Sequence, residues 1–353
     1  MSIGKNVKKK LLYFHAGRSS FVDKDIEILE CNYNVREFCF NTTNKSNYIF
    51  EFLKQIIFLI SNILTAKLIV CQFASHCSFF PVLFSKLFFK KSVIVAGGTD
   101  CVSFPSIAYG NFNSKLLRHT TTFSFKNCDL ILPVHETLVE YNYTYQNNDF
   151  PKQGFNYFIK NLKTPYEVIH NGYDSDKWFC NTNKETQSFV TIGAGLGSRF
   201  GFNLKGIDLI FEIAPEFPDS IFYIVGGAAI KLNAPSNVKL LDTIPNTKIQ
   251  ELLSTKQFYL QLSISEGFPN ALSEAMLCEC VPIVSHVGGM PDIVEDCGYI
   301  LKHKDVNELI NLIQTALANK QLITLGKKAR LRIANNYTFE KRKNKLLSAL
   351  DNL

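Results

Sequence analysis

The sequence lacks the patterns that identify secreted, metal-binding and membrane-spanning proteins. Its 353 residues include 10 cysteines, but these form no CxxC pair and no regular framework, so we expect reduced cysteines without a metal or redox role. The longest uncharged run of the most hydrophobic segment is 12 residues, at 55–66, whereas a membrane-spanning helix needs about 20. We therefore predict a core helix at residues 48–66. The apolar stretch near the start is too short for a signal peptide, which favours a cytoplasmic protein.

Motifs for metals, nucleoside triphosphates and nucleic acids are also missing. The chain has no GxxxxGK[ST] phosphate loop and no DxD after a predicted strand, so we predict no cofactor and no obligatory metal. It has no helix-turn-helix, RNP or zinc-finger pattern, so we predict no nucleic-acid partner.

Positive charge is concentrated in the first half of the chain. Residues 1–165 contain 19 Lys and Arg against 11 Asp and Glu, whereas the remaining residues contain 19 and 20. Within that half, aromatic residues of the segment 78–91 alternate with Lys86, Lys90 and Lys91. This pattern suits a surface that lies on an anionic membrane. A core-facing helix with favourable C-terminal lysines is the alternative.

Alternating strand and helix patterns predict the fold class. Such alternation is typical of parallel, doubly wound sheets, which bind ligands at the carboxyl ends of their strands. The length of 353 residues allows two domains. We therefore predict an α/β protein with two doubly wound, Rossmann-like domains and a cleft between them. Buried strands are expected at residues 10–16, 67–73, 92–100 and 129–133, and at residues 188–195, 221–227, 238–244 and 258–263.

Residues 265–292 carry the strongest site pattern. Seven residues separate Glu266 from Glu274, and Asn270 is a suitable N-cap for a helix between them. Because helical side chains lean toward the N-terminus, both carboxylates should flank an anion site made by the first N–H groups and the helix dipole. Two acids there suit the hydroxyls of a ribose and a sugar, although solvated acids are also common at helix starts. The expected cradle consists of Gly267, Phe268, Pro269, Asn270, Ala271 and Leu272.

Other candidates lie at the ends of predicted strands. The glycine-rich loop GLGSRFGFNLKG carries Arg199 and Lys205, which could clamp a pyrophosphate or could both be solvated. Gly226 follows a strand and would permit close approach of a nucleotide. In the first half, the sheet geometry places Gly17 and Asp100 at the crevice. A plain tight turn at Gly17 and an N-cap at Asp100 are the alternatives.

The strings EGFPNALSEAM, VPIVSHVGGMPDIVED and EVIHNGYD closely resemble the C-terminal motifs of glycosyltransferase family 4, whose members have the GT-B fold. The resemblance implies that Glu266 lies near the transferred sugar and that Glu274 binds the ribose. It also implies that Arg199 and Lys205 contact the donor phosphates. Gly226 and the cradle would then complete the nucleotide-sugar site.

Three positions depart from the family pattern. Asp100 stands at a strand end where the family often has a histidine beside the reacting centre, so the resemblance implies a catalytic role for it. His135 stands near the place of a usual serine, and we assign it no chemistry. Glu279 replaces the glycine that usually follows the motif helix, which leaves the local helix exit uncertain.

The resemblance also implies a domain arrangement and a reaction. Residues 1–165 would bind the acceptor, residues 166–335 would bind the nucleotide sugar, and residues 336–353 would pack back on the first domain as a helix. We expect a retaining transferase that moves a sugar from a UDP- or GDP-sugar to a glycan or lipid-linked acceptor in cell-envelope synthesis. It would be cytoplasmic or peripheral on the inner face of the cytoplasmic membrane. The alternatives are a sugar-nucleotide epimerase of the same architecture and a catalytically inert partner subunit.

Overall fold

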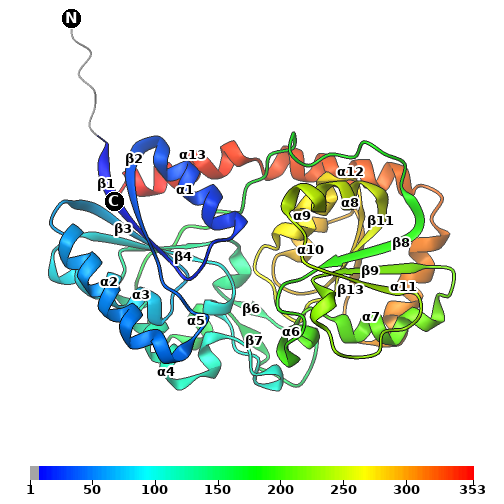
Figure 1. Cartoon of the computed structure of the whole chain (residues 1–353), viewed down its shortest axis with the longest axis horizontal. Coiled ribbons are helices and arrows are strands. Elements are labelled where there is room, and N and C mark those ends of the chain that lie inside the picture. The colour runs from blue at the N-terminus through cyan, green and yellow to red at the C-terminus, as the bar shows by residue number, and fades with distance from the viewer. Residues whose placement is uncertain (1–7) are drawn as a thin grey trace, which may run out of the picture.

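The computed structural model describes residues 8–353, apart from the side chains of Lys45 and Arg199. It contains two α/β domains side by side, and the chain passes twice between them (Figure 1). No helix in residues 8–353 combines the length and the apolar character needed to cross a membrane.

The first sheet forms from short apolar runs, which are typical of parallel strands buried on both faces. Its strand order is β2-β1-β3-β4-β5, and all neighbouring strands are parallel. The strands are β1 (Lys9–His15), β2 (Tyr33–Cys39), β3 (Ala66–Gln72), β4 (Lys91–Ala96) and β5 (Leu130–Pro133). The helices around it are α1 (Ser20–Asn32), α2 (Tyr48–Asn62), α3 (His76–Leu87) and α4 (Lys115–Asn127). A small hairpin of β6 (Tyr141–Asn142) and β7 (Lys152–Gln153), the short helix α5 (Phe155–Phe158) and several 3₁₀ turns complete the domain.

The second sheet is also parallel, with the order β10-β9-β8-β11-β12-β13. Its strands are β8 (Glu185–Ile192), β9 (Ile221–Val225), β10 (Val238–Leu241), β11 (Lys256–Gln261), β12 (Val281–Ser285) and β13 (Tyr299–Leu301). Its helices are α6 (Arg199–Leu204), α7 (Ile207–Ile213), α8 (Asn246–Thr255), α9 (Asn270–Leu277), α10 (Met290–Val294), α11 (Val306–Ala318) and α12 (Leu322–Asn336). The predicted pair of doubly wound sheets is therefore confirmed.

The last helix returns to the first domain. Helix α13 (Phe339–Asp351) lies beside α1 (Figure 1), and its Arg342 forms a buried ion pair with Asp25 of α1 at 2.8 Å. The two connections between the domains also bond to each other. The Tyr173 N–H donates to the Tyr337 carbonyl at 2.9 Å, and the Phe339 N–H donates to the Tyr173 carbonyl at 2.9 Å. The connections thus form one two-stranded hinge.

The predicted core helix at residues 48–66 is confirmed only in part. Helix α2 forms there and buries Leu59, but it also turns Glu51 and Gln55 inward and leaves five of its apolar side chains exposed. The polar side chains go inside because they find partners there. Glu51 Oε2 accepts from the Asn41 N–H at 3.2 Å, and Gln55 Nε2 donates to the Cys77 carbonyl at 2.8 Å.

Helix α3, in contrast, is mainly a core-facing helix. Its Phe79 ring lies 4.6 Å from the ring of Phe123, and its Phe80 ring lies 5.5 Å from that of Phe52. Of the segment 78–91, the exposed apolar residues are Leu87, the last residue of the helix, and Phe88 and Phe89 in the turn that follows it. Seven of the ten cysteines are buried, and all ten, which lie within residues 8–353, are free thiols.

Candidate functional site

The two domains meet where the strands of both sheets end. The backbone of Gly267, after β11, approaches the Gly97–Gly98 loop after β4 so closely that a Cβ on Gly267 would lie 2.5 Å from the Gly97 carbonyl oxygen. Glycine is therefore required at position 267. A cavity of about 170 Å³ lies beside this contact, between the domains. It is lined by Phe21, Gln72, Phe73, Gly97, Val134 and Asn171, and by residues 266–270.

Helix α9 positions most of the predicted cradle. The helix begins at Asn270, and Pro269 takes the N-cap position, so the prediction of Asn270 as N-cap is wrong by one residue. The Asn270 side chain instead accepts hydrogen bonds from the Tyr173 hydroxyl at 2.8 Å and from Asn171 Nδ2 at 3.2 Å. These bonds tie the start of α9 to the hinge. The first-turn N–H groups of the helix, which have no intrahelical acceptors, lie beside the cleft.

Glu266 is held by a network of donors. Its Oε1 accepts from Lys205 Nζ at 2.6 Å, from Ser263 Oγ at 2.8 Å and from Gln261 Nε2 at 2.9 Å. The structure thus brings the predicted sugar-orienting acid and one predicted phosphate-binding cation together. A carboxylate with three donors on one oxygen is fixed in direction before any substrate arrives, which is the preorganisation that a site needs.

Arg199, the second predicted phosphate-binding cation, begins α6, but its side chain lies outside the described part of the structure. Ser198 caps the first turn of the helix, because its Oγ accepts from the Gly201 N–H at 3.1 Å. Helix α6 ends one residue before Lys205. The short helix therefore connects the two candidate positions.

Glu274 lies one turn inside α9 and is buried, with 7% of its surface exposed. Among the described side chains, the cation paired with it is Lys24 of α1, in the other domain, whose Nζ lies 4.0 Å from Glu274 Oε1. Lys24 Nζ is buried, has no hydrogen-bond partner among the described residues, and lies 4.5 Å from the centre of the Tyr173 ring. Burial raises the pKa of Glu274 and lowers the pKa of Lys24, so each charged form is disfavoured by loss of water.

Sequence reasoning missed Lys24. The segment does carry a signal for the neighbouring residue, because Asp25 falls on the buried stripe of α1 with Val22 and Leu29. A charge at such a position needs a partner from elsewhere in the chain. The partner of Asp25 is Arg342, which lies 317 residues away, so the sequence alone could not identify this pair.

Asp100 does not face the crevice as predicted. Its side chain is fully buried, and its carboxylate accepts from the N–H groups of Ala74, Gly97 and Gly98 at 3.0 to 3.2 Å. The carboxylate therefore holds the glycine loop after β4, which is closer to the N-cap alternative. Burial raises its pKa, against the effect of these bonds. Its catalytic role remains an untested prediction.

The remaining predicted glycines differ in what they do. Gly226 has a φ of 82°, and a Cβ there would lie 2.1 Å from the Gly193 carbonyl oxygen, so only glycine fits between these strand ends. Gly17 lies in the exposed loop after β1, with open space around it. At Glu279 the helix exit is made without glycine. This glutamate takes the left-handed conformation itself, with a φ of 61°.

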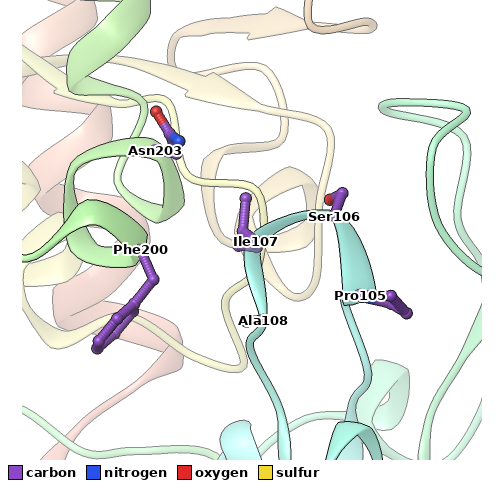
Figure 2. A pocket seen from close by; sticks show the side chains of 6 residues that line it. All are labelled: Pro105, Ser106, Ile107, Ala108, Phe200 and Asn203. Atoms are coloured by element: carbon purple, nitrogen blue, oxygen red, sulfur yellow. The ribbon is translucent and has the colours of Figure 1, made fainter.

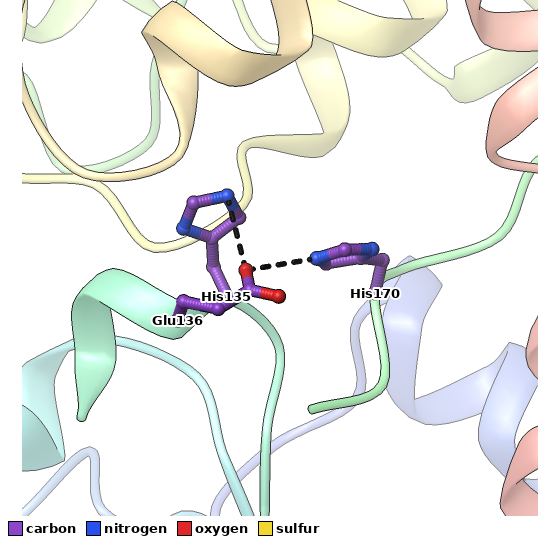
Figure 3. A group of neighbouring side chains, drawn as sticks. All are labelled: His135, Glu136 and His170. Carbon is purple, nitrogen blue, oxygen red and sulfur yellow. Dashed lines mark hydrogen bonds and ion pairs between the residues drawn. The ribbon is translucent and has the colours of Figure 1, made fainter. Parts of the chain in front are cut away.

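A side-chain group at the domain boundary could hold a metal. His135, Glu136 and His170 each offer one ligand atom, and these atoms lie within 4.8 Å of one another (Figure 3). His135 Nε2 also lies 3.2 Å from Asp292 Oδ2 of the other domain. The same distances fit an ion-pair network between imidazoles and carboxylates. Burial lowers the pKa of His135, and the facing carboxylates of Glu136 and Asp292 oppose that shift.

A second opening between the domains lies next to α6. It has a volume of about 390 Å³, and the loop of residues 105–108 lies opposite the helix that carries Phe200 and Asn203 (Figure 2). The rings of Tyr109 and Phe200 stack across the boundary, 6.4 Å apart. Because α6 ends one residue before Lys205, the same short helix lines this opening and leads into the predicted phosphate-binding position. No sequence motif pointed to this opening.

Comparison with known proteins finds similarity to glycosyltransferases. Residues 198–338 match the family model described as glycosyl transferases group 1. The phosphatidylinositol N-acetylglucosaminyltransferase GPI3 subunit of Saccharomyces cerevisiae is 24% identical over 59% of this chain and 47% of that protein. An Escherichia coli UDP-Gal:alpha-D-GlcNAc-diphosphoundecaprenol alpha-1,3-galactosyltransferase is 26% identical over 51% of this chain and 52% of that protein. The match thus spans about half the length of each of these relatives.

The similarity of folds extends over the whole chain. HepE of Anabaena, solved in complex with UDP and glucose, aligns with a TM-score of 0.74 and 15% identity over 98% of this chain and 100% of that chain. The predicted GT-B fold is therefore confirmed, and both the Glu266 motif and the Lys205 loop lie within the family match.

Proposed function

Because the chain has the GT-B fold and its residues 198–338 match the glycosyl transferases group 1, we propose that it moves a hexose from a nucleoside-diphosphate sugar to an acceptor hydroxyl. The observation that carries the proposal is the arrangement around the start of α9. There a fixed carboxylate and a cation 2.6 Å from it lie just before a helix N-terminus at the domain boundary, and a second, buried carboxylate lies one turn inside the same helix. The configuration at the transferred carbon would be retained, as the resemblance implies.

Each group has a role that its environment supports. Glu266, whose Oε1 is occupied by donors, would accept sugar hydroxyls through its other oxygen. Glu274 would accept the ribose hydroxyls, because a buried carboxylate without a close donor gains hydrogen bonds when they arrive. Lys205 and Arg199 would stabilise the charge that develops on the diphosphate as its bond to the sugar breaks. Closure about the hinge would exclude water from the reacting sugar.

The donor is proposed to be UDP- or GDP-linked and to bind without an obligatory metal. HepE, which shares the fold, was solved with UDP, and this supports a uridine donor. Lys205, Arg199 and the positive end of α9 can supply the charge that a divalent ion supplies elsewhere. Asp100 would act indirectly, because its carboxylate holds the loop that faces Gly267.

The acceptor is proposed to be a lipid-linked glycan of the cell envelope, reached at the inner face of the cytoplasmic membrane. The name of the Escherichia coli relative describes an acceptor that is linked to diphosphoundecaprenol. The positive excess of residues 1–165 is consistent with work at an anionic surface. The opening beside α6 offers the acceptor a route to the sugar from the first domain.

Calorimetric titration with UDP, GDP and ADP, without metal, tests the donor site. Wild type should bind one of the three, and Glu274→Ala should weaken that binding by about 1 to 3 kcal/mol, as expected when a buried polar contact is lost. Glu340→Gln, an exposed glutamate on α13 whose side chain is 65% exposed, is the matched control and should bind like wild type. Absence of binding by all three nucleotides would contradict the proposal.

Turnover of the donor separates the proposed transferase from its alternatives. Transfer consumes the nucleotide sugar only when an acceptor hydroxyl is present. An epimerase would change the donor without an acceptor, and an inert partner subunit would bind the nucleotide but leave the donor unchanged. Product analysis by mass spectrometry, with and without a synthetic prenyl-linked sugar, distinguishes the three.

A further inference from the structure

Helix α2 exposes apolar side chains that a surface helix normally buries. Its inward side carries Leu59 together with Glu51 and Gln55, and its outward side carries a row of apolar residues at helical spacing. The row comprises Ile49, Phe50, Leu53, Ile57 and Ile60, whose exposed fractions run from 52% to 72%. Single exposed apolar residues are normal on proteins, but a continuous row marks a surface that meets an apolar partner.

The turn between α3 and β4 extends this row. Its Phe89 is 96% exposed and holds a left-handed φ of 51°. The turn lies beside the end of α2, because Lys90 Nζ donates to the carbonyl of Leu64 at 3.1 Å, and Leu64 is itself exposed. We call the whole surface the α2 face. It consists of Ile49, Phe50, Leu53, Ile57, Ile60, Leu64, Leu87 and Phe89.

Basic side chains border the α2 face at its Leu64 end. Lys10 Nζ donates to Thr65 Oγ1 at 2.7 Å, next to the last exposed leucine. Lys90 lies in the turn, and Lys67 and Lys86 are exposed on the flanking strand and helix. An apolar row bordered by lysines matches the interface of an anionic bilayer, where acyl chains lie beneath negative headgroups.

The geometry points to one occupant: we propose that the α2 face docks on an anionic lipid bilayer, with α2 parallel to the membrane plane and Phe89 inserted below the headgroups. A helix of 15 residues is about 22 Å long, which is too short to cross a hydrocarbon core of about 30 Å. The helix therefore lies on the membrane. The inference adds a partner surface to the proposed function through its lipid-linked acceptor, but docking itself does not depend on the reaction.

This surface differs from the one that the sequence suggested. The aromatic residues of α3 pack inward, and from the segment 78–91 only the final turn belongs to the α2 face. In Figure 1, α2 lies on the outer side of the first domain, away from the second domain. Docking there would leave the hinge and the second domain free to move over the bilayer.

Flotation of the full chain with vesicles tests the proposal. At low salt, wild type should bind vesicles of phosphatidylcholine that contain roughly 30 mol% phosphatidylglycerol. It should bind vesicles of pure phosphatidylcholine only weakly. The triple variant Ile57→Gln, Ile60→Gln, Phe89→Asn should bind the anionic vesicles on the order of tenfold less. Asparagine is chosen at position 89 because it tolerates a left-handed φ.

The matched control carries the same kind of change on the other domain. Ile323→Gln, Leu331→Gln and Leu232→Gln replace three apolar residues that are also more than half exposed, and this variant should bind vesicles like wild type. Equal binding by the two variants, or no binding by wild type, would overturn the proposal. So would a wild-type dimer, seen by light scattering without lipid, that the α2-face variant loses, since the occupant would then be a second copy.

The readouts separate failure of docking from failure of the proposed function. The α2-face variant should keep the nucleotide affinity of wild type, because the face lies outside the cleft. Loss of donor binding in wild type would contradict the transferase without affecting docking. Normal donor binding without vesicle binding would contradict docking alone.

Discussion

Two neighbouring residues of α1 show two uses of a buried charge. The Asp25 carboxylate accepts hydrogen bonds from Nε and Nη2 of Arg342, each at 2.8 Å. Nη1 of Arg342 donates to the carbonyls of Ile169 and His170 at 3.0 Å. Lys24, the residue before it, stops 4.0 Å from Glu274 and donates no hydrogen bond within the described chain. Both pairs connect α1 to residues of the second half of the chain, yet only one is complete.

The complete pair suits a structural role, whereas the incomplete pair suits a role in ligand binding. The complete pair fixes α13 to the first domain and leaves no polar atom for a ligand. The incomplete pair holds two desolvated charges with free hydrogen-bonding capacity at the domain boundary, and hydroxyls of a ligand could satisfy them. An unsatisfied buried charge is costly, so its presence favours a functional role.

Breaking the complete pair should have the largest effect. Arg342→Met leaves the Asp25 carboxylate buried without a partner, so we expect the free energy of unfolding to fall by about 3 to 5 kcal/mol. Urea denaturation followed by circular dichroism measures this change. Arg36→Met, on an exposed arginine of β2, should stay within about 0.5 kcal/mol of wild type. A similar small change for Arg342→Met would show that the pair contributes little.

A third pair, Lys205–Glu266, is complete like Asp25–Arg342 but lies in the proposed active site. Lys205→Met should lower kcat/KM about 100- to 1,000-fold, which is roughly 2.7 to 4 kcal/mol of transition-state stabilisation. Stability should change far less, because both side chains are partly exposed. Initial rates with the donor that binds are the measurement, and Lys248→Met on α8 is the exposed control. A rate within threefold of wild type would exclude Lys205 from phosphate stabilisation.

Neutralising the incomplete pair should separate stability from affinity. In Lys24→Met with Glu274→Gln, no charge remains desolvated, so stability should be unchanged or higher by up to about 2 kcal/mol. Nucleotide binding should still weaken by about 1 to 3 kcal/mol. Thermal unfolding and calorimetric titration of the same preparation give both values. If stability falls as it does for Arg342→Met, the contrast between the two pairs is wrong.

The smallest expected effect concerns His135, which faces Asp292 at the domain boundary. Burial lowers its pKa from 6.5, so as the pH falls below 6.5 the unfolded chain takes up a proton before the folded chain does. Wild type should therefore lose stability from pH 6.5 downward, by at most about 1.4 kcal/mol per pH unit from this group. His135→Asn should flatten the curve, although His76, whose pKa burial also lowers, contributes in the same range.

Urea denaturation at pH 7.5, 6.5 and 5.5 checks the His135 prediction. His303→Gln is the control, because this histidine is 64% exposed, and it should keep the wild-type slope. Identical slopes for wild type and His135→Asn would show that His135 titrates alike in both states. Asparagine can replace the histidine as acceptor for the Thr137 N–H, so the local cap is retained.

The positions of Glu266 and Glu274 on their element were predictable because their determinants are local. Glu266 lies in the loop before α9 and Glu274 one turn inside that helix, as helix signals in one short segment indicate. The parallel sheets were predictable for the same reason, from short apolar runs between helices. Lys24 was not, since nothing in its own segment reveals a partner 250 positions away.

The α2 face shows a second limit of sequence reasoning. The periodicity of residues 48–62 predicts an apolar stripe, but periodicity does not tell which side faces the core. In the structure the inward side carries Leu59 with Glu51 and Gln55, which bond to backbone groups of Asn41 and Cys77. Asp100 was misplaced for a similar reason, because three backbone donors draw its carboxylate inward.

The return of α13 also has a consequence for how the protein is made. Leu346, Ala349 and Leu350 belong to the core of the first domain, yet a ribosome synthesises the whole of residues 174–338 before it reaches them. At about 5 to 20 residues per second, that delay lasts roughly 10 to 30 s. During this delay, Asp25 has no Arg342 to pair with, and the surface that α13 will cover is accessible to chaperones. The first domain is therefore synthesised first but is expected to complete its folding last.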